Sequence, residues 1–288
     1  MTSGPAYSGY PSASIDSRGH IHLVWYGFDG TAYQVFYTHF NGNNWSAPIK
    51  LSEGFPDSVN PTIAVDSKDN LHVAWFKSNG RQYQIYYIRW SGSWSDQIVL
   101  SSGLTDSFNP SIAVDRMDRV YVVWDKGEAG RTQIYYVVYD DGTWTQQSPL
   151  TTDEVGSENP SVAVNNLGTV YVFYDKTDGQ IYLRKFSGVL LPEERLTSSG
   201  ENSYPSVRWS FNQNPFSDAG GRIDYVWTSK ENGQVRVFYG QLGIERHSIQ
   251  RVEDRSFLVK SGAAVTVVGV TLFLLFLYRR HSVGKRKP

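Results

Sequence analysis

Four short polar loops, about fifty residues apart, carry side chains that could bind a ligand. Each loop precedes a proline, and they read Asp57-Ser58-Val59-Asn60, Asp106-Ser107-Phe108-Asn109, Gly156-Ser157-Glu158-Asn159 and Asn202-Ser203-Tyr204. Carboxylates, amides and hydroxyls together suit hydrogen bonding to the hydroxyl groups of a sugar. Asn, Asp and Ser also cap their own backbone in turns, and for any single residue we favour that interpretation.

A second set of charged residues lies further along each repeat, at Asp29, Arg81, Asp125 with Lys126, Arg131, and Asp175 with Lys176. Acid pairs such as Asp125 and Asp175 could serve a glycosidase, but pairs among 28 acidic residues are expected by chance. His20, His22 and His72 occupy turn and strand positions, where we expect packing rather than metal binding. We predict no metal and no cofactor. The candidate binding residues are Asp57, Asn60, Arg81, Asp106, Asn109, Asp125, Arg131, Asn159 and Asp175.

These loops belong to a repeat, marked by Pro11, Pro61, Pro110, Pro160 and Pro205 at spacings of 50, 49, 50 and 45 residues. The proline should open a first strand, because it cannot donate a ladder hydrogen bond. A polar turn and a second strand follow, and the second strand ends in an aromatic residue: Trp25, Trp75, Trp124, Tyr174 or Trp227. A third strand, a turn and a short fourth strand complete each unit. Five such units predict an all-β fold of radial four-stranded sheets, with the aromatics filling the space between them.

One turn motif points to a known family. Tyr139-Asp140-Asp141-Gly142-Thr143-Trp144 is the fullest copy, and shorter versions end at Trp45 and Trp94. Together with the repeated Pro-Ser-Ile-Ala-Val-Asp strands, this resembles the Asp-box (BNR) repeats of sialidase-like β-propellers, over about residues 7–240. The resemblance implies a five-bladed propeller over residues 7–242. Sialidases of this family have six blades, so a sixth blade is expected if sequence is missing upstream.

The resemblance also implies where a site would lie. In such propellers one face is built from the loops before the innermost strands and the loops between the second and third strands. Both sets of candidate residues would then ring the mouth of the central channel. A retaining sialidase needs three arginines, a Tyr–Glu nucleophile pair and an aspartic acid–base. The arginine motif F/Y-R-I-P does not occur here, and Arg208 and Arg236 fall within expected strands.

We therefore expect a non-catalytic module that binds a glycan or a surface protein. Two alternatives stay open: a sialidase-like exo-glycosidase, and a structural or adhesive stalk component that recognises protein. The formal charge of residues 1–260 is −6, which argues against nucleic-acid binding. The chain has no cysteine, which excludes disulfides, cysteine-bound metal and thiol catalysis.

The C-terminal region predicts a membrane anchor. Residues 261–278 form 18 consecutive uncharged and mainly apolar positions, enough for a membrane-spanning helix. Residues 243–260 would be a stalk, and residues 279–288 carry five Lys or Arg and no acid. The positive-inside rule places this tail in the cytoplasm and the propeller outside the cell. That orientation needs a leader upstream of the given sequence; the alternative is a cytosolic, tail-anchored protein.

Overall fold

The computed structural model describes residues 7–54, 56–210, 222–242 and 247–248. Within these ranges every regular element is a β-strand. No helix in the described part is long and apolar enough to cross a membrane. The predicted stalk, the predicted span at 261–278 and the basic tail lie outside the described residues, apart from the two residues 247–248.

The strands form five antiparallel sheets, here called blades 1 to 5. Blade 1 contains β1 (Ser8–Ile15), β2 (Ile21–Phe28), β3 (Tyr33–Phe40) and β4 (Ile49–Lys50). Blade 2 contains β5 (Ser58–Val65), β6 (Leu71–Ser78), β7 (Tyr83–Trp90) and β8 (Ile98–Val99). Blade 3 contains β9 (Ser107–Val114), β10 (Val120–Glu128), β11 (Arg131–Asp140), β12 (Thr143–Trp144) and β13 (Ser148–Pro149).

The last two blades follow the same order. Blade 4 contains β14 (Ser157–Val164), β15 (Val170–Lys176), β16 (Gln180–Phe186) and β17 (Glu194–Arg195). Blade 5 contains β18 (Glu201–Ser210), β19 (Arg222–Glu231), β20 (Gln234–Leu242) and β21 (His247–Ser248). The blades are four-stranded as predicted, except that β12 and β13 both pair with β11 in blade 3.

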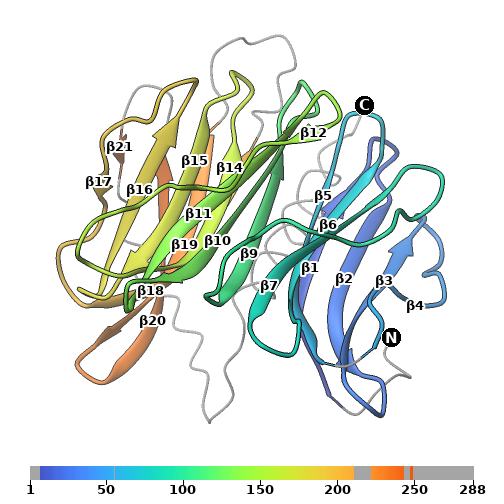
Figure 1. Ribbon diagram of the computed structural model, residues 1–288. Coiled ribbons are helices and arrows are strands. Elements are labelled where there is room, and N and C mark those ends of the chain that lie inside the picture. The colour runs from blue at the N-terminus through green and yellow to red at the C-terminus, as the bar shows by residue number, and fades with distance from the viewer. Residues whose placement is uncertain (1–6, 55, 211–221, 243–246, 249–288) are drawn as a thin grey trace, which may run out of the picture.

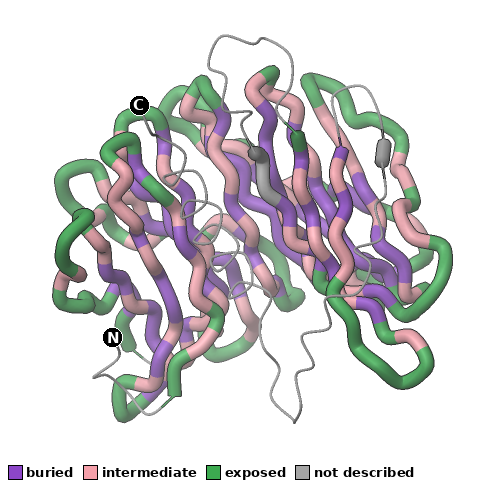
Figure 2. Tube along the Cα trace, turned by 180° about the vertical axis from the view of Figure 1, so that it is seen from behind, coloured by how far each residue is buried: buried purple, intermediate pink, exposed green. Residues whose placement is uncertain are grey.

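The first strand of each blade packs against the first strand of the next, from β1 through β5, β9 and β14 to β18. The sheets therefore succeed one another around a common axis in chain order, as a five-bladed β-propeller (Figure 1). The buried positions lie along the middle of the strands and the exposed ones at the turns (Figure 2). This arrangement confirms the all-β radial architecture predicted from the repeat.

The core lies between neighbouring blades, where the repeated aromatics were expected. Trp75 packs with blade 1 residues, Trp124 with blade 2 residues and Tyr174 with blade 3 residues. All three side chains are fully buried. Trp94 and Trp144, from the turn motif, add edge-to-face contacts to the preceding blade at Tyr37 and Tyr87, with ring centroids 5.3 and 4.9 Å apart.

The expected start of the first strands was wrong by three residues in blades 1 to 4 and by four in blade 5. In blade 2 the strand begins at Ser58, and Pro61 lies inside it. The pairing with the second strand shifts between Val59 and Thr62, which marks a β-bulge at the proline. The bulge explains how proline is tolerated, because its missing N–H falls where the ladder is already interrupted.

The histidines pack inside the blades, as expected. His72 Nδ1 lies 2.6 Å from the Tyr87 hydroxyl, and its Nε2 lies 3.3 Å from a carboxylate oxygen of Asp66. His22 makes the corresponding contact with Tyr37 in blade 1. Desolvation on burial lowers the pKa of both histidines, so each stays neutral near pH 7.

Candidate functional site

The residue before each repeat proline lies at a bulge of the innermost strand and has a left-handed backbone. These residues are Tyr10, Asn60, Asn109, Asn159 and Tyr204, with φ between 49° and 53°. Asparagine adopts this conformation more readily than most residues, whereas tyrosine is uncommon there. The bulge turns one side chain from each blade to the same level of the ring.

The three asparagines join their blades through a chain of side-chain hydrogen bonds. Asn60 Nδ2 donates to Asn109 Oδ1 at 3.1 Å, and Asn109 Nδ2 donates to Asn159 Oδ1 at 3.4 Å. Asn159 Nδ2 donates to both carboxylate oxygens of Asp175, at 3.1 and 3.2 Å. Blades 2 to 4 are therefore linked near the axis by three amide side chains, all of which belong to the candidate residues predicted from the sequence.

Asp125 and Asp175 connect each of their blades to the next. Asp125 accepts hydrogen bonds from Asn109 Nδ2 at 3.0 Å and from the backbone N–H of Asn159 at 3.1 Å. Asp175 accepts the backbone N–H of Tyr204 at 3.0 Å. Both residues follow the core aromatic of the second strand, and so they reach the bulge of the following blade. Both carboxylates thus contact Asn159, which places them together at the site.

Burial controls the ionisation of this pair. Asp125 is 3% exposed and Asp175 is 7% exposed. Desolvation raises the pKa of Asp125 to about 6 and that of Asp175 to about 7, and the charge of Glu158 adds to both shifts. The hydrogen bonds from Asn109, Asn159 and Tyr204 act in the opposite direction. Oδ1 of Asp125 is buried and has no hydrogen-bond partner among the described residues, so it can carry the proton.

Two aromatic residues occupy the bulge position in blades 1 and 5 and were not selected from the sequence. Tyr10 is 45% exposed and Tyr204 is 59% exposed, although both are large and largely apolar. Tyr10 stacks on Tyr26 with ring centroids 5.7 Å apart. The repeat itself could have identified both tyrosines, because they occupy the position before the proline where the other blades have asparagine.

Four of the predicted residues lie elsewhere. The carboxylates of Asp57 and Asp106 accept the backbone N–H groups of Tyr33 and Tyr83 at 2.8 Å, and so hold the preceding blade's hairpin. Arg81 and Arg131 are exposed at the hairpins between the second and third strands. No hydrogen bond described in the structure joins these four side chains to the asparagine chain.

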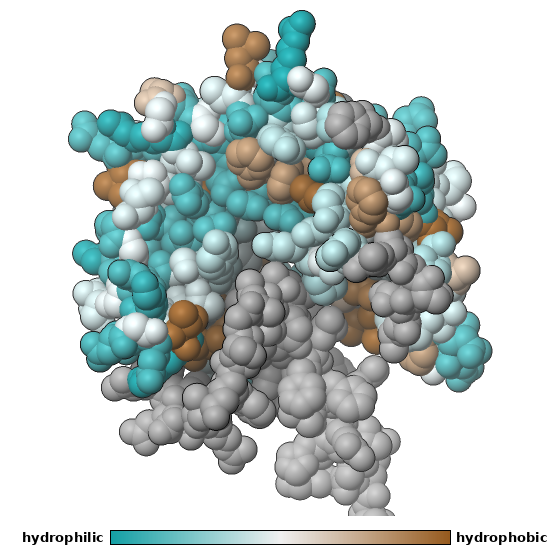
Figure 3. All heavy atoms as spheres, turned by 90° about the horizontal axis from the view of Figure 1, so that it is seen from below, coloured by the Kyte–Doolittle hydropathy of each residue, from teal (hydrophilic) through white to brown (hydrophobic). Residues whose placement is uncertain are grey.

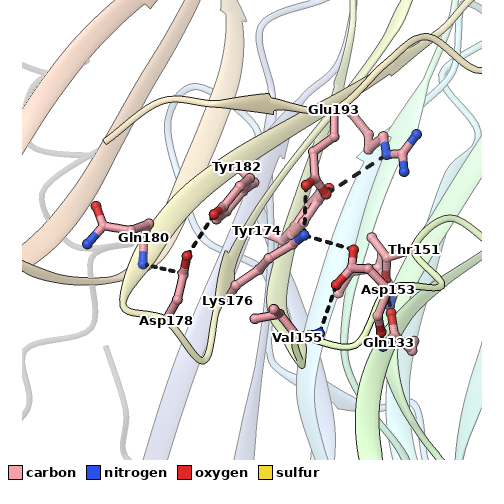
Figure 4. A network of polar contacts seen from close by, with 12 residues as sticks. Gln133, Thr151, Asp153, Val155, Tyr174, Lys176, Asp178, Gln180, Tyr182 and Glu193 are labelled. Carbon is pink, nitrogen blue, oxygen red and sulfur yellow. Dashed lines mark hydrogen bonds and ion pairs between the residues drawn. The ribbon is translucent and has the colours of Figure 1, made fainter. Parts of the chain in front are cut away.

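A buried lysine supports blade 4 next to the site. Lys176 follows Asp175 and its side chain is 5% exposed. Its Nζ lies 2.8 Å from Asp153 Oδ2 and 2.7 Å from Glu193 Oε2, and Tyr174 donates a hydrogen bond to the other oxygen of Glu193 (Figure 4). Asp153 belongs to the loop between blades 3 and 4. The ion pair therefore fixes one face of the end of β15, while Asp175 bonds to the asparagine chain on the opposite face.

The end of the ring that carries these loops is shown in Figure 3, which looks from below onto the β2–β3 and β19–β20 hairpins. Hydrophilic residues predominate on the visible part of this face, with separate hydrophobic side chains among them. Within the described residues no cluster of His, Asp and Glu is arranged to hold a metal ion. The asparagine and aspartate side chains can form hydrogen bonds, and the exposed tyrosine rings can make apolar contacts.

Comparison with known proteins gives the fold. The sequence matches no known family and no curated protein. The structure is similar to the NanB sialidase of Streptococcus pneumoniae, with a TM-score of 0.60 and 11% identity; the match covers 86% of this chain and 60% of that one. It is also similar to the Aleuria aurantia lectin in complex with Fucalpha1-6GlcNAc, with a TM-score of 0.57 and 15% identity, covering 83% and 77% of the two chains.

A polysaccharide lyase, an ulvan lyase, is a third similar structure, with a TM-score of 0.53 and 12% identity, covering 81% of this chain and 64% of that one. All three proteins are named for action on carbohydrate or were solved with a carbohydrate bound. At these identities the likeness is one of fold. The chain therefore has a β-propeller fold that it shares with sialidase, lectin and lyase structures.

Proposed function

We propose that this protein binds glycans, without catalysis, at the asparagine chain near the axis of the propeller. The observation that carries the proposal is the hydrogen-bonded group of Asn159, Asp125 and Asp175, to which the backbone N–H of Tyr204, a residue with an exposed ring, is bonded through Asp175. Amides and carboxylates can bond sugar hydroxyls, while an exposed ring offers an apolar face with a polar tip. The carbohydrate-related names of three structural neighbours support the same ligand class.

The alternative is a sialidase-like exo-glycosidase. The raised pKa of Asp175, about 7, favours it, because a general acid works best near the ambient pH. We nevertheless prefer binding, because each buried aspartate already holds a neighbouring blade through a backbone N–H. The three candidate arginines in the described part also do not come together to bind a substrate carboxylate: Arg81 and Arg131 lie on hairpins, and Arg236 is exposed on β20.

The binding proposal is tested on a glycan array with the full chain in detergent and a fluorogenic sialoside assay alongside. We expect binding without turnover, and at least about ten-fold weaker binding for Tyr204→Ala, since a stacking or hydrogen-bonded anchor is worth about 1.4 kcal/mol or more. Val189→Ala is the control. Val189 is also exposed, but it lies on the hairpin after β16, at the other end of the ring. Sialoside turnover that is lost in Asp175→Asn would favour the exo-glycosidase. Equal glycan binding by Tyr204→Ala and Val189→Ala would contradict the proposed site.

We further propose that the protein is anchored at the cell surface by residues 261–278, with residues 243–260 as a stalk and residues 279–288 in the cytoplasm. The uncharged span and the five basic residues behind it support this orientation. Protease added to intact cells should remove the propeller and leave a membrane-bound stub of about 3 kDa. A propeller that is degraded only after lysis would instead indicate the cytosolic, tail-anchored alternative.

The turn motif supports a distant relationship to the Asp-box propellers, which we include in the proposal. Asp141 and Gly142 both have positive φ, at 45° and 87°, and form the turn between β11 and β12. Trp144 then packs onto Tyr87 of the preceding blade. The turn conformation and the inter-blade tryptophan give the motif a structural role rather than a catalytic one.

A further inference from the structure

Every joint between consecutive blades uses the same two faces. The forward face of a blade, which meets the next blade, presents an aliphatic residue on the third strand: Val35, Ile85, Ile134 or Ile181, all 0% exposed. The backward face, which meets the preceding blade, presents alternate residues of the second strand. Leu71, Val73 and Trp75 form it in blade 2, and each is at most 1% exposed.

An aromatic pair completes two of these joints. Tyr37 on the forward face of blade 1 meets Trp94 on the backward face of blade 2, with ring centroids 5.3 Å apart. Tyr87 of blade 2 meets Trp144 of blade 3 in the same way at 4.9 Å. At these two joints an aliphatic residue and a tyrosine thus lie against the tryptophans of the next blade.

The backward face of blade 1 has no such neighbour among the described residues. Its Ile21 and Leu23 are half-buried, whereas their counterparts in blades 2 to 5 are at most 2% exposed. A cavity of about 230 Å³ lies on this face, lined by Leu23, Trp25 and Trp45 together with Pro11 and Pro48. Trp45 occupies the same position in its turn as Trp94 and Trp144. Within the described residues, the backward face of blade 1 therefore keeps open a cavity next to Trp45, where blades 2 and 3 have a tyrosine of the preceding blade against the equivalent tryptophan.

The forward face of blade 5 carries the matching residues. Val237 stands opposite Thr228, as Ile85 stands opposite Phe76, and yet Val237 is 50% exposed where its counterparts are fully buried. Tyr239 has the position of Tyr37 and Tyr87, and its hydroxyl bonds to Asp224 at 2.5 Å much as theirs bond to histidine. Blade 5 thus ends with an exposed aliphatic residue and a half-buried tyrosine on its forward face.

We propose that the forward face of blade 5 docks onto the backward face of blade 1 in a second copy of this chain. Within one chain the two faces do not meet in the described part, because no substantial contact joins β18, β19 or β20 to a strand of blade 1. Tyr239 of one copy would lie against Trp45 of the other, in the geometry already present between Tyr37 and Trp94. The contact is head-to-tail, so copies form a ring or a filament according to the rotation between them.

The absence of cysteine makes a direct cross-linking test possible. Full-length Trp45→Cys and Tyr239→Cys chains, carrying different tags, are mixed in detergent and treated with a short bismaleimide. We expect a mixed dimer in at least ten-fold greater yield than from Trp45→Cys mixed with Val189→Cys, whose cysteine lies on an outer hairpin. Val237→Cys replaces Tyr239→Cys if the latter melts below the parent protein, because Val237 is already half exposed.

Each other outcome overturns the proposal. A link that forms only within the double variant Trp45→Cys/Tyr239→Cys, and never between mixed chains, would show that blade 5 closes onto blade 1 of its own ring. No link in either experiment would show that another segment or another protein covers these faces. Parent protein that scatters light as a single chain across the concentration range would likewise exclude a second copy.

Discussion

Replacing Trp124 by alanine is expected to lower the free energy of unfolding by about 3–5 kcal/mol. The ring is fully buried at the joint of blades 2 and 3, where it packs with Ala74, Phe76 and Ile85 of the preceding blade. Interiors pack at crystal-like density, so neighbouring side chains can only partly fill the space left by an indole. Denaturant unfolding followed by tryptophan fluorescence measures the loss.

Trp45→Ala is the matched control for this prediction. Trp45 is the same residue type, but it lines the open cavity of blade 1 and is only half-buried. In the single chain, where no second copy covers Trp45, its replacement should cost about 1 kcal/mol, as substitutions outside a closed core usually do. Equal losses in the two variants would contradict the view that the blade joints form the core of this protein.

The second large effect concerns pH. Burial raises the pKa of Asp125 to about 6 and that of Asp175 to about 7, against an ordinary value near 3.8. The folded protein therefore binds these protons more tightly than the unfolded chain does. The resulting stabilisation is complete below pH about 4 and is lost as the pH rises through 6 and 7. At about 1.4 kcal/mol per unit of pKa shift, each group contributes on the order of 3 kcal/mol.

The measurement compares the parent with Asp125→Asn/Asp175→Asn, because asparagine imitates the protonated acid. Relative to this variant, the parent should lose stability between about pH 4 and pH 7, on the order of several kcal/mol for the two groups, and little more above pH 7. His22 and His72, with lowered pKa values, act in the opposite direction, but they are present in both chains and cancel in the comparison. A difference that stays constant over this range, or that grows in favour of the parent, would contradict the burial of the two carboxylates.

Local sequence predicted the sheets well, because each unit encodes its own hairpins. The core aromatics Trp75 and Trp124 were also assigned correctly, because a large ring that recurs at the same strand position in each repeat is best buried between the sheets. The start of the first strand was misplaced because a proline can begin a strand or lie at a bulge, and the residues near Pro61 are compatible with both. The left-handed conformation of Asn60, which decides between them, is not encoded by composition.

Only part of the predicted set of polar residues lies together in the structure. Asn60, Asn109, Asn159, Asp125 and Asp175 do come together, whereas Asp57 and Asp106 hold hairpins of the preceding blades. Both groups look alike in sequence, because each is a polar residue beside a turn. Their roles differ because Asp57 and Asp106 bond to the preceding blade, whereas Asp125 and Asp175 bond to the following blade.

The sequence by itself determined the repeat, the number of sheets, the aromatic positions and the polar character of the loops, because these depend on residues close together in the chain. The tertiary structure alone decided which carboxylates are buried, which tyrosines remain exposed, and that the outer faces of blades 1 and 5 lack a partner among the described residues. The physical reason is that pKa shifts and exposure depend on neighbours in adjacent blades, 34 and 29 residues away for the buried carboxylates of Asp125 and Asp175, brought near only when the blades pack.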